Sequence, residues 1–348
     1  MKIAILLPYK ENFSLKYPGS VSIFLKDTLK LSNYHKNTFV YGDTNFNQRI
    51  SKNYINLSFK KSFFRSNSYS YLNRFVDKTL NKNFDIIEVH NRPKYIPFLI
   101  KHFSNLVLYF HNDPISMEGS KSVSERLYLL EKLKFIIFNS KWTKKKFLEN
   151  LSIPSKLKKK LLIIHQSTNK IKIDLSNKKN LITFIGKLNL SKGYDLFGAS
   201  IIQILDKFQN WKAVIFGDEN REKYNFKHKN LKIIGFKKHD YIMNYLKKVS
   251  ICVICSRWDE PFGRVALEAS SRGCATIITN KGGLPEAVTD SIKINKINKN
   301  SVYNAINKLI LNKKLRIKLQ KNSIKNFYLT NELVSKKIDS YRNKIFKT

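Results

Sequence analysis

The strongest constraint on the fold is a repeated alternation of short apolar runs with polar loops and amphipathic stretches. In the first half of the chain the apolar runs cover residues 2–7, 38–41, 85–90, 105–110, 135–138 and 161–164. Runs of this length, separated by loops and segments of helical periodicity, indicate strands joined by helices. The first half is therefore predicted to form βαβ units around a parallel sheet.

The second half repeats this alternation. Its apolar runs cover residues 181–185, 212–216, 231–234, 250–255 and 275–279, with helical stretches at 194–208, 239–248, 264–272 and beyond 300. We predict an α/β fold with two Rossmann-like doubly wound domains that face each other across a cleft. Residues 1–168 are predicted to form an N-terminal domain and residues 169–180 a polar linker. Residues 181–325 are predicted to form a second domain that binds a ligand, and residues 326–348 a C-terminal helix that packs back on the first domain.

The charge balance points to an anionic partner. The 348 residues include 65 Lys and Arg against 25 Asp and Glu, a formal net charge of +40. Nucleic acid, acidic lipids and phosphorylated ligands would each be attracted by such a positive charge. A composition rich in Lys, Asn and Ile explains the same excess without any partner. The hydrophobic content of 42% excludes a disordered basic tail.

Cysteine usage and the N-terminus bear on the cellular location. Cys252 and Cys255 lie in an apolar run, where residues three apart point to opposite faces of a strand, and no second Cys or His pair follows at zinc spacing. The apolar run at residues 3–7 is too short for a signal peptide, and no run approaches the ~18 residues of a spanning helix. We expect a cytoplasmic protein, either free or attached to the inner face of the cytoplasmic membrane.

Residues 256–269 form the most informative segment, because they follow a predicted buried strand and open a helix. Pro261 suits the start of a helix, and Gly263 lets the backbone approach a ligand closely. The free N–H groups and the dipole of that first turn favour an anion such as a phosphate. Glu260 and Glu268 are suited to accept hydrogen bonds from sugar or ribose hydroxyls. The alternative is a solvated ion ladder of Glu260, Arg264 and Glu268 at spacings of four residues.

Two further segments follow strands of the same half. Gly186 and Lys187 end the first strand, and Lys192 lies five residues further along the loop, so that the two lysines can converge on a diphosphate. Gly282 and Gly283 form a turn after the last strand that lets backbone line a cleft.

These motifs, taken in order, resemble family 4 retaining glycosyltransferases of the GT-B fold. The glutamates match the E-x7-E pattern of that family, and the resemblance is close over residues 181–288. It implies that Glu268 binds the ribose, Glu260 contacts the donor sugar, and Lys187 and Lys192 contact the diphosphate. Lys187 stands where the family commonly has Arg, which keeps the charge and loses the bidentate fork. The remaining nucleotide-sugar contacts implied by the resemblance are Gly186, Gly235, Phe262, Gly263 and Arg264.

The N-terminal half carries a looser resemblance. Gly19 lies where the family has a glycine-rich loop after its first strand, with one glycine instead of two. His111 ends a strand, and in the family a histidine at this place faces the donor sugar. His90 and Arg92 follow another strand and are acceptor-side candidates.

The resemblance implies transfer of a sugar, with retention, from a nucleoside diphosphate sugar to a hydroxyl of a glycan or glycolipid, in synthesis of cell-surface polysaccharide or lipopolysaccharide. The residues given catalytic roles are Lys192, Glu260 and His111. No cofactor or metal is implied, and no Asp-x-Asp pattern occurs. The donor base, donor sugar, acceptor and linkage stay open.

Basic clusters with neighbouring aromatic residues occur at 60–65, 141–146 and 156–160 in the N-terminal half. They favour either an anionic membrane surface, on which a glycolipid acceptor would lie, or nucleic acid. The alternative function is thus a basic nucleic-acid-binding protein without enzymatic activity, although no helix-turn-helix, RNP or zinc-finger pattern supports it. A dinucleotide oxidoreductase or an epimerase is disfavoured, because no G-x-G-x-x-G follows the first strand.

Overall fold

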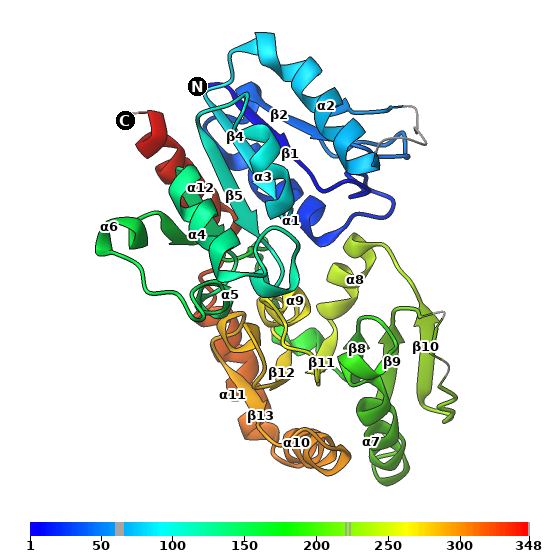
Figure 1. Cartoon of the computed structure of the whole chain (residues 1–348). Helices are drawn as coiled ribbons and strands as arrows, with labels where there is room; N and C mark the ends of the chain where they lie inside the picture. Colours follow the sequence, from blue (N-terminus) through cyan, green and yellow to red (C-terminus); the bar gives the residue numbers. More distant parts are fainter. Residues whose placement is uncertain (60–65, 220, 223, 347–348) are drawn as a thin grey trace. The chain divides into compact units, whose positions relative to one another are not determined.

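The computed structural model describes residues 1–59, 66–219, 221–222 and 224–346 (Figure 1). The chain forms two compact units. Unit 1 comprises Met1–Ser167 and Asn331–Thr348, and unit 2 comprises Thr168–Thr330. Among the described helices, none has the length and apolar character needed to cross a membrane.

Unit 1 is built on a parallel sheet with seven described strands in the order β3-β2-β1-β4-β5-β6-β7. Every described pairing between these named strands is parallel, and the central strand β1 pairs with β2 on one side and β4 on the other. The strands are apolar on both faces because helices cover both faces of the sheet. Their bounds are β1 Ile3–Leu6, β2 Thr38–Gly42, β3 Tyr54–Asn56, β4 Ile86–His90, β5 Leu106–Phe110, β6 Phe135–Phe138 and β7 Leu161–Ile163.

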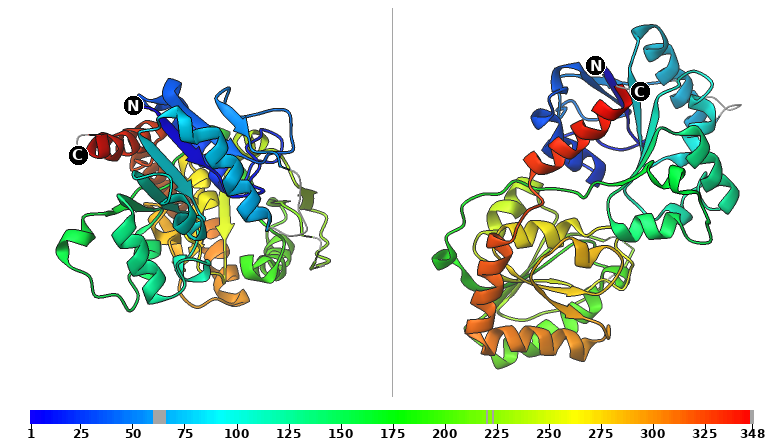
Figure 2. Two further views of the ribbon diagram at one scale, coloured as in Figure 1. Left: turned by 45° about the horizontal axis from the view of Figure 1, so that its top comes forward. Right: turned by 90° about the vertical axis from the view of Figure 1, so that its left-hand side faces the viewer.

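The helices of unit 1 fall on two sides of this sheet. One core gathers aromatic residues such as Tyr71, Phe75 and Phe147 beneath α2, α4 and α5. The other core joins Phe24 of α1 with Ile338 of α12, so the C-terminal helix packs on the sheet of unit 1 (Figure 2). The helices are α1 Ser20–Thr28, α2 Asn67–Thr79, α3 Ile96–Leu99, α4 Val123–Lys132, α5 Lys141–Phe147, α6 Ser155–Lys158 and α12 Asn331–Phe346.

Unit 2 is a second parallel sheet, with six described strands in the order β10-β9-β8-β11-β12-β13. Numbered within the unit this is 3-2-1-4-5-6, the doubly wound order in which the direction of winding reverses between the first and fourth strands. The strands are β8 Lys179–Ile185, β9 Lys212–Phe216, β10 Leu231–Gly235, β11 Val249–Ile254, β12 Ala275–Thr279 and β13 Ser291–Ile294. The helices are α7 Tyr194–Lys207, α8 His239–Leu246, α9 Arg264–Ser271, α10 Lys299–Leu311 and α11 Lys313–Lys325.

The two faces of the second sheet carry separate cores, and the cysteines show the separation. Cys252 packs with α8 and α9 residues such as Leu246 and Ala266, whereas Cys255 packs with α7 residues such as Phe197. Both thiols are free and buried, and burial raises the pKa of Cys255 to about 12. The prediction of structural cysteines on opposite faces of a strand is confirmed.

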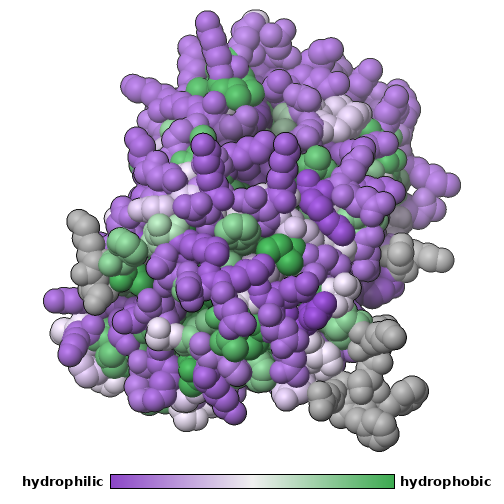
Figure 3. Space-filling model, turned by 90° about the horizontal axis from the view of Figure 1, so that it is seen from above, coloured by the Kyte–Doolittle hydropathy of each residue, from purple (hydrophilic) through white to green (hydrophobic). Residues whose placement is uncertain are grey.

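The α/β fold with two doubly wound sheets is confirmed, and the differences from the sequence prediction are local. Residues 169–180 do not form a separate linker: Asn169 accepts hydrogen bonds from Arg272, and the whole segment belongs to unit 2. The cluster expected at residues 60–65 lies outside the described residues. The hydrophilic surface expected from the charge is visible in Figure 3, where hydrophobic side chains form only small groups on the face shown.

Candidate active site

The switch point of the unit 2 sheet brings together two of the predicted motifs. Strands β8 and β11 are neighbours and parallel, so their carboxyl ends meet at one edge. The loop after β8 carries Gly186 to Lys192, and the loop after β11 carries Ser256 to Gly263. Main-chain N–H groups of Arg257 and Trp258 both donate to the carbonyl of Ser191, which ties the two loops together. Ligands of doubly wound sheets bind at this edge.

Lys192 and Glu260 meet across this edge. Nζ of Lys192 lies 2.5 Å from Oε1 of Glu260, and the hydroxyl of Ser256 donates to the same oxygen at 2.6 Å. The lysine side chain is 31% exposed and the glutamate 12% exposed. The cation is therefore held at the mouth of the site, with one side paired and the rest open to a ligand.

Glu268 is the most buried acid of the site. Its Oε1 lies 2.8 Å from Nε2 of His239 at the start of α8 and 2.7 Å from Nε of Arg264. Its side chain is 6% exposed. Burial alone would raise the pKa of Glu268, but the charges of Arg264 and His239 outweigh it, so the pKa lies below its usual value and the group is a carboxylate.

The alternative of a solvated ion ladder along one helix is therefore wrong. Glu260 precedes α9 and pairs with Lys192 instead of Arg264, and Glu268 is buried. Arg264 does pair with Glu268, but this contact lies at the edge of the core and fixes the carboxylate in place.

Three glycines let backbone segments of the site approach each other. Gly263, the N-cap of α9, has φ +104°, and a Cβ there would lie 2.4 Å from Leu284 Cδ2. A Cβ on Gly282 would lie 2.2 Å from the carbonyl oxygen of Glu260, and the N–H of Gly283 donates to that same oxygen at 2.6 Å. The turn at Gly282 and Gly283 thus holds the loop that carries Glu260 by a main-chain hydrogen bond.

The other predicted nucleotide contacts differ in what they present. Lys187 is exposed, and the side chain of Phe262 is buried in the core, so Phe262 offers only its backbone. Gly235 has φ +76° with open space where a Cβ would be, and Gly186 has φ +150°. Both glycines end strands of the same edge, β10 and β8.

Sequence reasoning missed three side chains of this region. His239 lies against Glu268, Ser256 binds Glu260, and Arg257 forms a bidentate pair with Asp195 of α7 at 2.5 and 2.6 Å. Ser256 and Arg257 directly follow β11, so their place at a strand end was a usable signal. The meeting of His239 with Glu268 depends on how α8 packs against α9.

In unit 1 the two predicted histidines form a pair. Nδ1 of His90 lies 2.9 Å from Nε2 of His111, and the ring planes differ by 17°. Burial is the main reason why the pKa of His90 falls to about 3 and that of His111 falls well below its usual value, so both rings are neutral. The N–H of His111 donates to Oδ1 of Asn91, and its carbonyl accepts from Asn139.

This burial corrects two expectations for the N-terminal half. The side chain of His90 is 1% exposed and stacked on Tyr109, and that of His111 is 4% exposed, so neither ring is open to solvent. Arg92 is only partly buried. At the start of α1, the carboxylate of Glu11 occupies the space beside Gly19 and accepts from the N–H and hydroxyl of Ser22. A phosphate would meet a carboxylate there, and the expected contact of Gly19 with phosphate does not fit this arrangement.

Among the described residues, no group of three or more His, Cys, Asp or Glu side chains lies close enough to hold a metal ion. The side chains that converge on the switch point instead combine two carboxylates with lysine and arginine cations. Such a set suits a ligand with both hydroxyl groups and phosphates.

The fold and the residues at the carboxyl edge of the unit 2 sheet can be compared with those of known proteins. The structure of HepE from Anabaena in complex with UDP and glucose superimposes with a TM-score of 0.76 over 99% of both chains, at 15% identity, and the shared fold is the GT-B fold of two Rossmann-like domains. Residues 165–326 match the family model described as glycosyl transferases group 1. Over these residues, which lie almost entirely in unit 2, the chain is similar to glycosyltransferases of this group.

Curated relatives with glycosyltransferase names are also similar to this chain. A putative glycosyltransferase of Bacillus subtilis, YtcC, is 28% identical over 279 residues, which cover 70% of this chain and 68% of that protein. The lipopolysaccharide 1,2-N-acetylglucosaminetransferase of Salmonella typhimurium is 24% identical over 40% of this chain and 42% of its own length. Several other curated relatives align over only 25–35% of their own length. None of these findings supports a nucleic-acid-binding protein without enzymatic activity.

Proposed function

We propose that the protein is a retaining glycosyltransferase of family 4 that moves a sugar from a nucleoside diphosphate sugar to a hydroxyl of a glycan or glycolipid. The observation that carries this proposal is the convergence of Lys192, Glu260 and Glu268 at the switch point of the unit 2 sheet. The UDP named for HepE supports a nucleoside diphosphate as the ligand.

The nucleotide would bind along the carboxyl edge of the sheet. Glu268 is ionised and held in one orientation, so its oxygens are suited to accept hydrogen bonds from the ribose hydroxyls. The N-terminus of α9 lies beside Gly263, and the positive end of the helix dipole there favours the diphosphate. Gly235 has open space at its Cβ position at the end of β10, where the base would lie. Lys187 is exposed in the loop after β8 and would contact the phosphates.

The reaction separates charge at the diphosphate. The bond between the anomeric carbon and the phosphate oxygen breaks, and the acceptor oxygen bonds to the same face of that carbon. The acceptor proton passes to the departing phosphate oxygen, so no separate protein base is assigned. Lys192 would stabilise the leaving phosphate and Glu260 would hold hydroxyls of the sugar, while the family resemblance assigns a sugar contact to His111. The protein cations would take the role that a metal has elsewhere.

The acceptor belongs to cell-surface polysaccharide or lipopolysaccharide synthesis in this proposal, in line with the name of the Salmonella relative. A glycolipid acceptor would explain the exposed lysines of unit 1, which include Lys141 and Lys145 on α5 and Lys156 and Lys158 on α6. We expect binding to vesicles with anionic lipid and release by high salt, because these charges are solvated. Equal binding to neutral and anionic vesicles would contradict a membrane role.

The proposal is tested by incubation with a panel of UDP-, GDP- and ADP-sugars, first with water and then with candidate glycans as acceptors. Glu268→Ala is expected to weaken binding of the nucleoside diphosphate, measured by calorimetry, whereas Lys192→Ala mainly lowers turnover. The anomeric configuration of the product, read by NMR, tests retention. Normal donor affinity and normal turnover in both variants would overturn the site.

A further inference from the structure

In unit 1, the rings of His90 and His111 are joined by a hydrogen bond whose direction depends on the surroundings of each ring. The shared hydrogen bond holds a single proton between Nδ1 of His90 and Nε2 of His111, because both rings are neutral. If His90 donates, the second nitrogen of His111, Nδ1, carries a proton. If His111 donates, its Nδ1 is a bare acceptor. The direction of one hydrogen bond therefore decides what His111 offers to a ligand.

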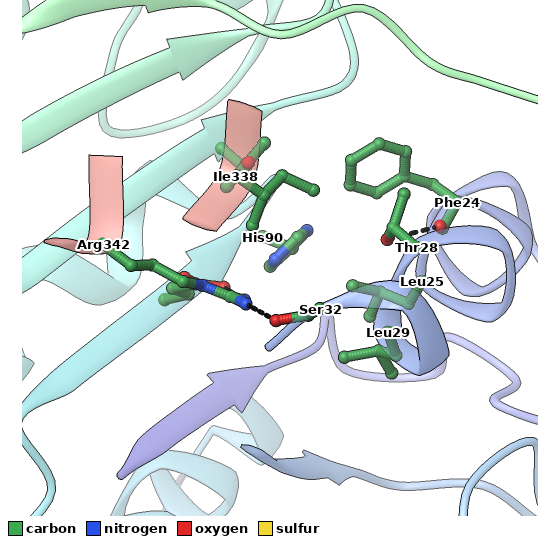
Figure 4. Close-up of a pocket in the computed structure, with 10 residues that line it drawn as sticks. Phe24, Leu25, Thr28, Leu29, Ser32, His90, Ile338 and Arg342 are labelled. Atoms are coloured by element: carbon green, nitrogen blue, oxygen red, sulfur yellow. Dashed lines mark hydrogen bonds and ion pairs between the residues drawn. The ribbon is translucent and has the colours of Figure 1, made fainter. Parts of the chain in front are cut away.

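A charged group lies beside the outer side of His90. His90 lines a small cavity together with Arg342 of α12, Glu88 of β4, side chains of α1, and Ser32 in the segment that follows α1. Figure 4 shows the His90 ring between the guanidinium of Arg342 and the α1 side chains. Among the described residues Nε2 of His90 has no hydrogen-bond partner, so its proton state is set by these surroundings.

Arg342 is fixed and charged. Its Nε and its second terminal nitrogen donate to Glu88 at 2.7 and 2.9 Å, and its other terminal nitrogen donates to Ser32 at 3.0 Å. Its side chain is 3% exposed. The carboxylates nearby, Glu88 and Asp339, are already engaged with it. After burial, the charge of Arg342 is the second cause that lowers the pKa of His90, and the same repulsion disfavours a donor hydrogen on Nε2.

We propose that Arg342 and His90 are positioning residues that hold His111 in the neutral tautomer with its proton on Nδ1. The lone pair on Nε2 of His90 places its proton on Nδ1, from which it is donated to Nε2 of His111. Nδ1 of His111 is buried and has no hydrogen-bond partner among the described residues, so in this tautomer the ring holds an unpaired N–H donor. Under the proposed function, on which this assignment of purpose rests, that N–H is the hydrogen-bond donor for a sugar oxygen.

The test reads the tautomer directly. In protein labelled with ¹⁵N histidine, long-range ¹H–¹⁵N correlation spectra show which ring nitrogen carries the proton, and His111→Asn and His90→Asn assign the two rings among seven histidines. The wild type is expected to show His111 protonated on Nδ1 alone. A proton on Nε2 of His111 instead, or two protons on either ring near neutral pH, would overturn the proposal.

Variants separate positioning from folding. His90→Phe keeps a planar ring without a donor, and His90→Asn retains a donor near the Nδ1 position. Turnover should fall about tenfold or more in the first, with the donor KM little changed, and recover in the second. Val89→Ala, in the same strand but packed in the opposite core, is the stability control and should keep the tautomer. Equal turnover in His90→Phe and Val89→Ala would contradict the positioning role.

The contribution of Arg342 is tested with variants that keep or remove the buried charges of Arg342 and Glu88. Arg342→Lys keeps a cation and should keep the tautomer, whereas Glu88→Gln with Arg342→Met removes the buried ions together and should yield a mixture of tautomers. An unchanged tautomer in the double variant would remove Arg342 from the proposal. If no sugar transfer is found at all, the spectra still decide the tautomer, so failure of the proposed function and of this inference are distinguishable.

Discussion

The buried pair of Glu88 and Arg342 is expected to anchor the C-terminal helix α12 to unit 1. Arg342→Met keeps most of the apolar stem and removes the charge, which leaves Glu88, 1% exposed, without its cation. Two charge-assisted hydrogen bonds to Glu88 and one to Ser32 are lost at once. Breaking a buried pair in this way costs about 3–5 kcal/mol, and we expect the free energy of unfolding of unit 1 to fall by that amount.

The assay has to report on unit 1 alone, because two units need not unfold in one step. The chain has three Trp, and Trp211→Phe with Trp258→Phe leaves Trp142 of α5 as the fluorescent reporter in urea. Arg126→Met is the matched control. This arginine is also buried in unit 1, but its hydrogen bonds go to backbone carbonyls, so we expect a loss of only about 1–2 kcal/mol.

A double-mutant cycle with Glu88→Gln completes the test. The double variant should be less destabilised than the sum of the single variants, with a coupling of about 2 kcal/mol or more, because no buried ion is left alone. A loss in Arg342→Met no larger than that in Arg126→Met, or a coupling near zero, would refute the anchoring role.

Three further outcomes are expected. Gly263→Ala should destabilise unit 2 by about 2 kcal/mol, because its Cβ would meet Leu284. Gly235→Ala has open space at its Cβ and should cost about half as much free energy of unfolding. Equal losses in urea titrations would contradict this prediction. Glu260→Gln releases Lys192 from its pair, so UDP binding measured by calorimetry should tighten about fivefold while turnover falls; weaker UDP binding would count against it. His90 and His111 have pKa values below those of the unfolded chain, so the unfolded state gains protons first on acidification. Unit 1 should therefore lose about 1.4 kcal/mol per histidine between pH 7.5 and 5.5, and a loss of equal size in the His90→Phe variant would contradict this origin.

Most strands followed from the sequence because they are apolar on both faces and end at glycines or polar loops. The runs at 135–138, 212–216 and 275–279 match strands β6, β9 and β12 to the residue. The short edge strands β3 and β13 were not predicted, because they are only three or four residues long and mostly half-buried. Helix α4 was also missed, although Ser122 and Glu125 form a capping box at its start.

The candidate site was predictable where its residues follow strands directly. Glu260, Lys192 and Gly263 lie in loops after β11 and β8, and the parallel order of the sheet brings these loops together. His239 and Glu11 were not predicted, since their places depend on the packing of helices and on the path of a long loop. The burial of His90 was not predicted, because a histidine at the end of a strand has the same sequence pattern whether it is buried or exposed.

The most direct test of the central claim is the structure of the protein in complex with UDP. We expect electron density for the ribose on Glu268 and for the diphosphate between the first turn of α9 at Gly263 and the amine of Lys192. Density for UDP at another edge of either sheet, or none in crystals at saturating UDP, would contradict the assignment of this switch point as the nucleotide site.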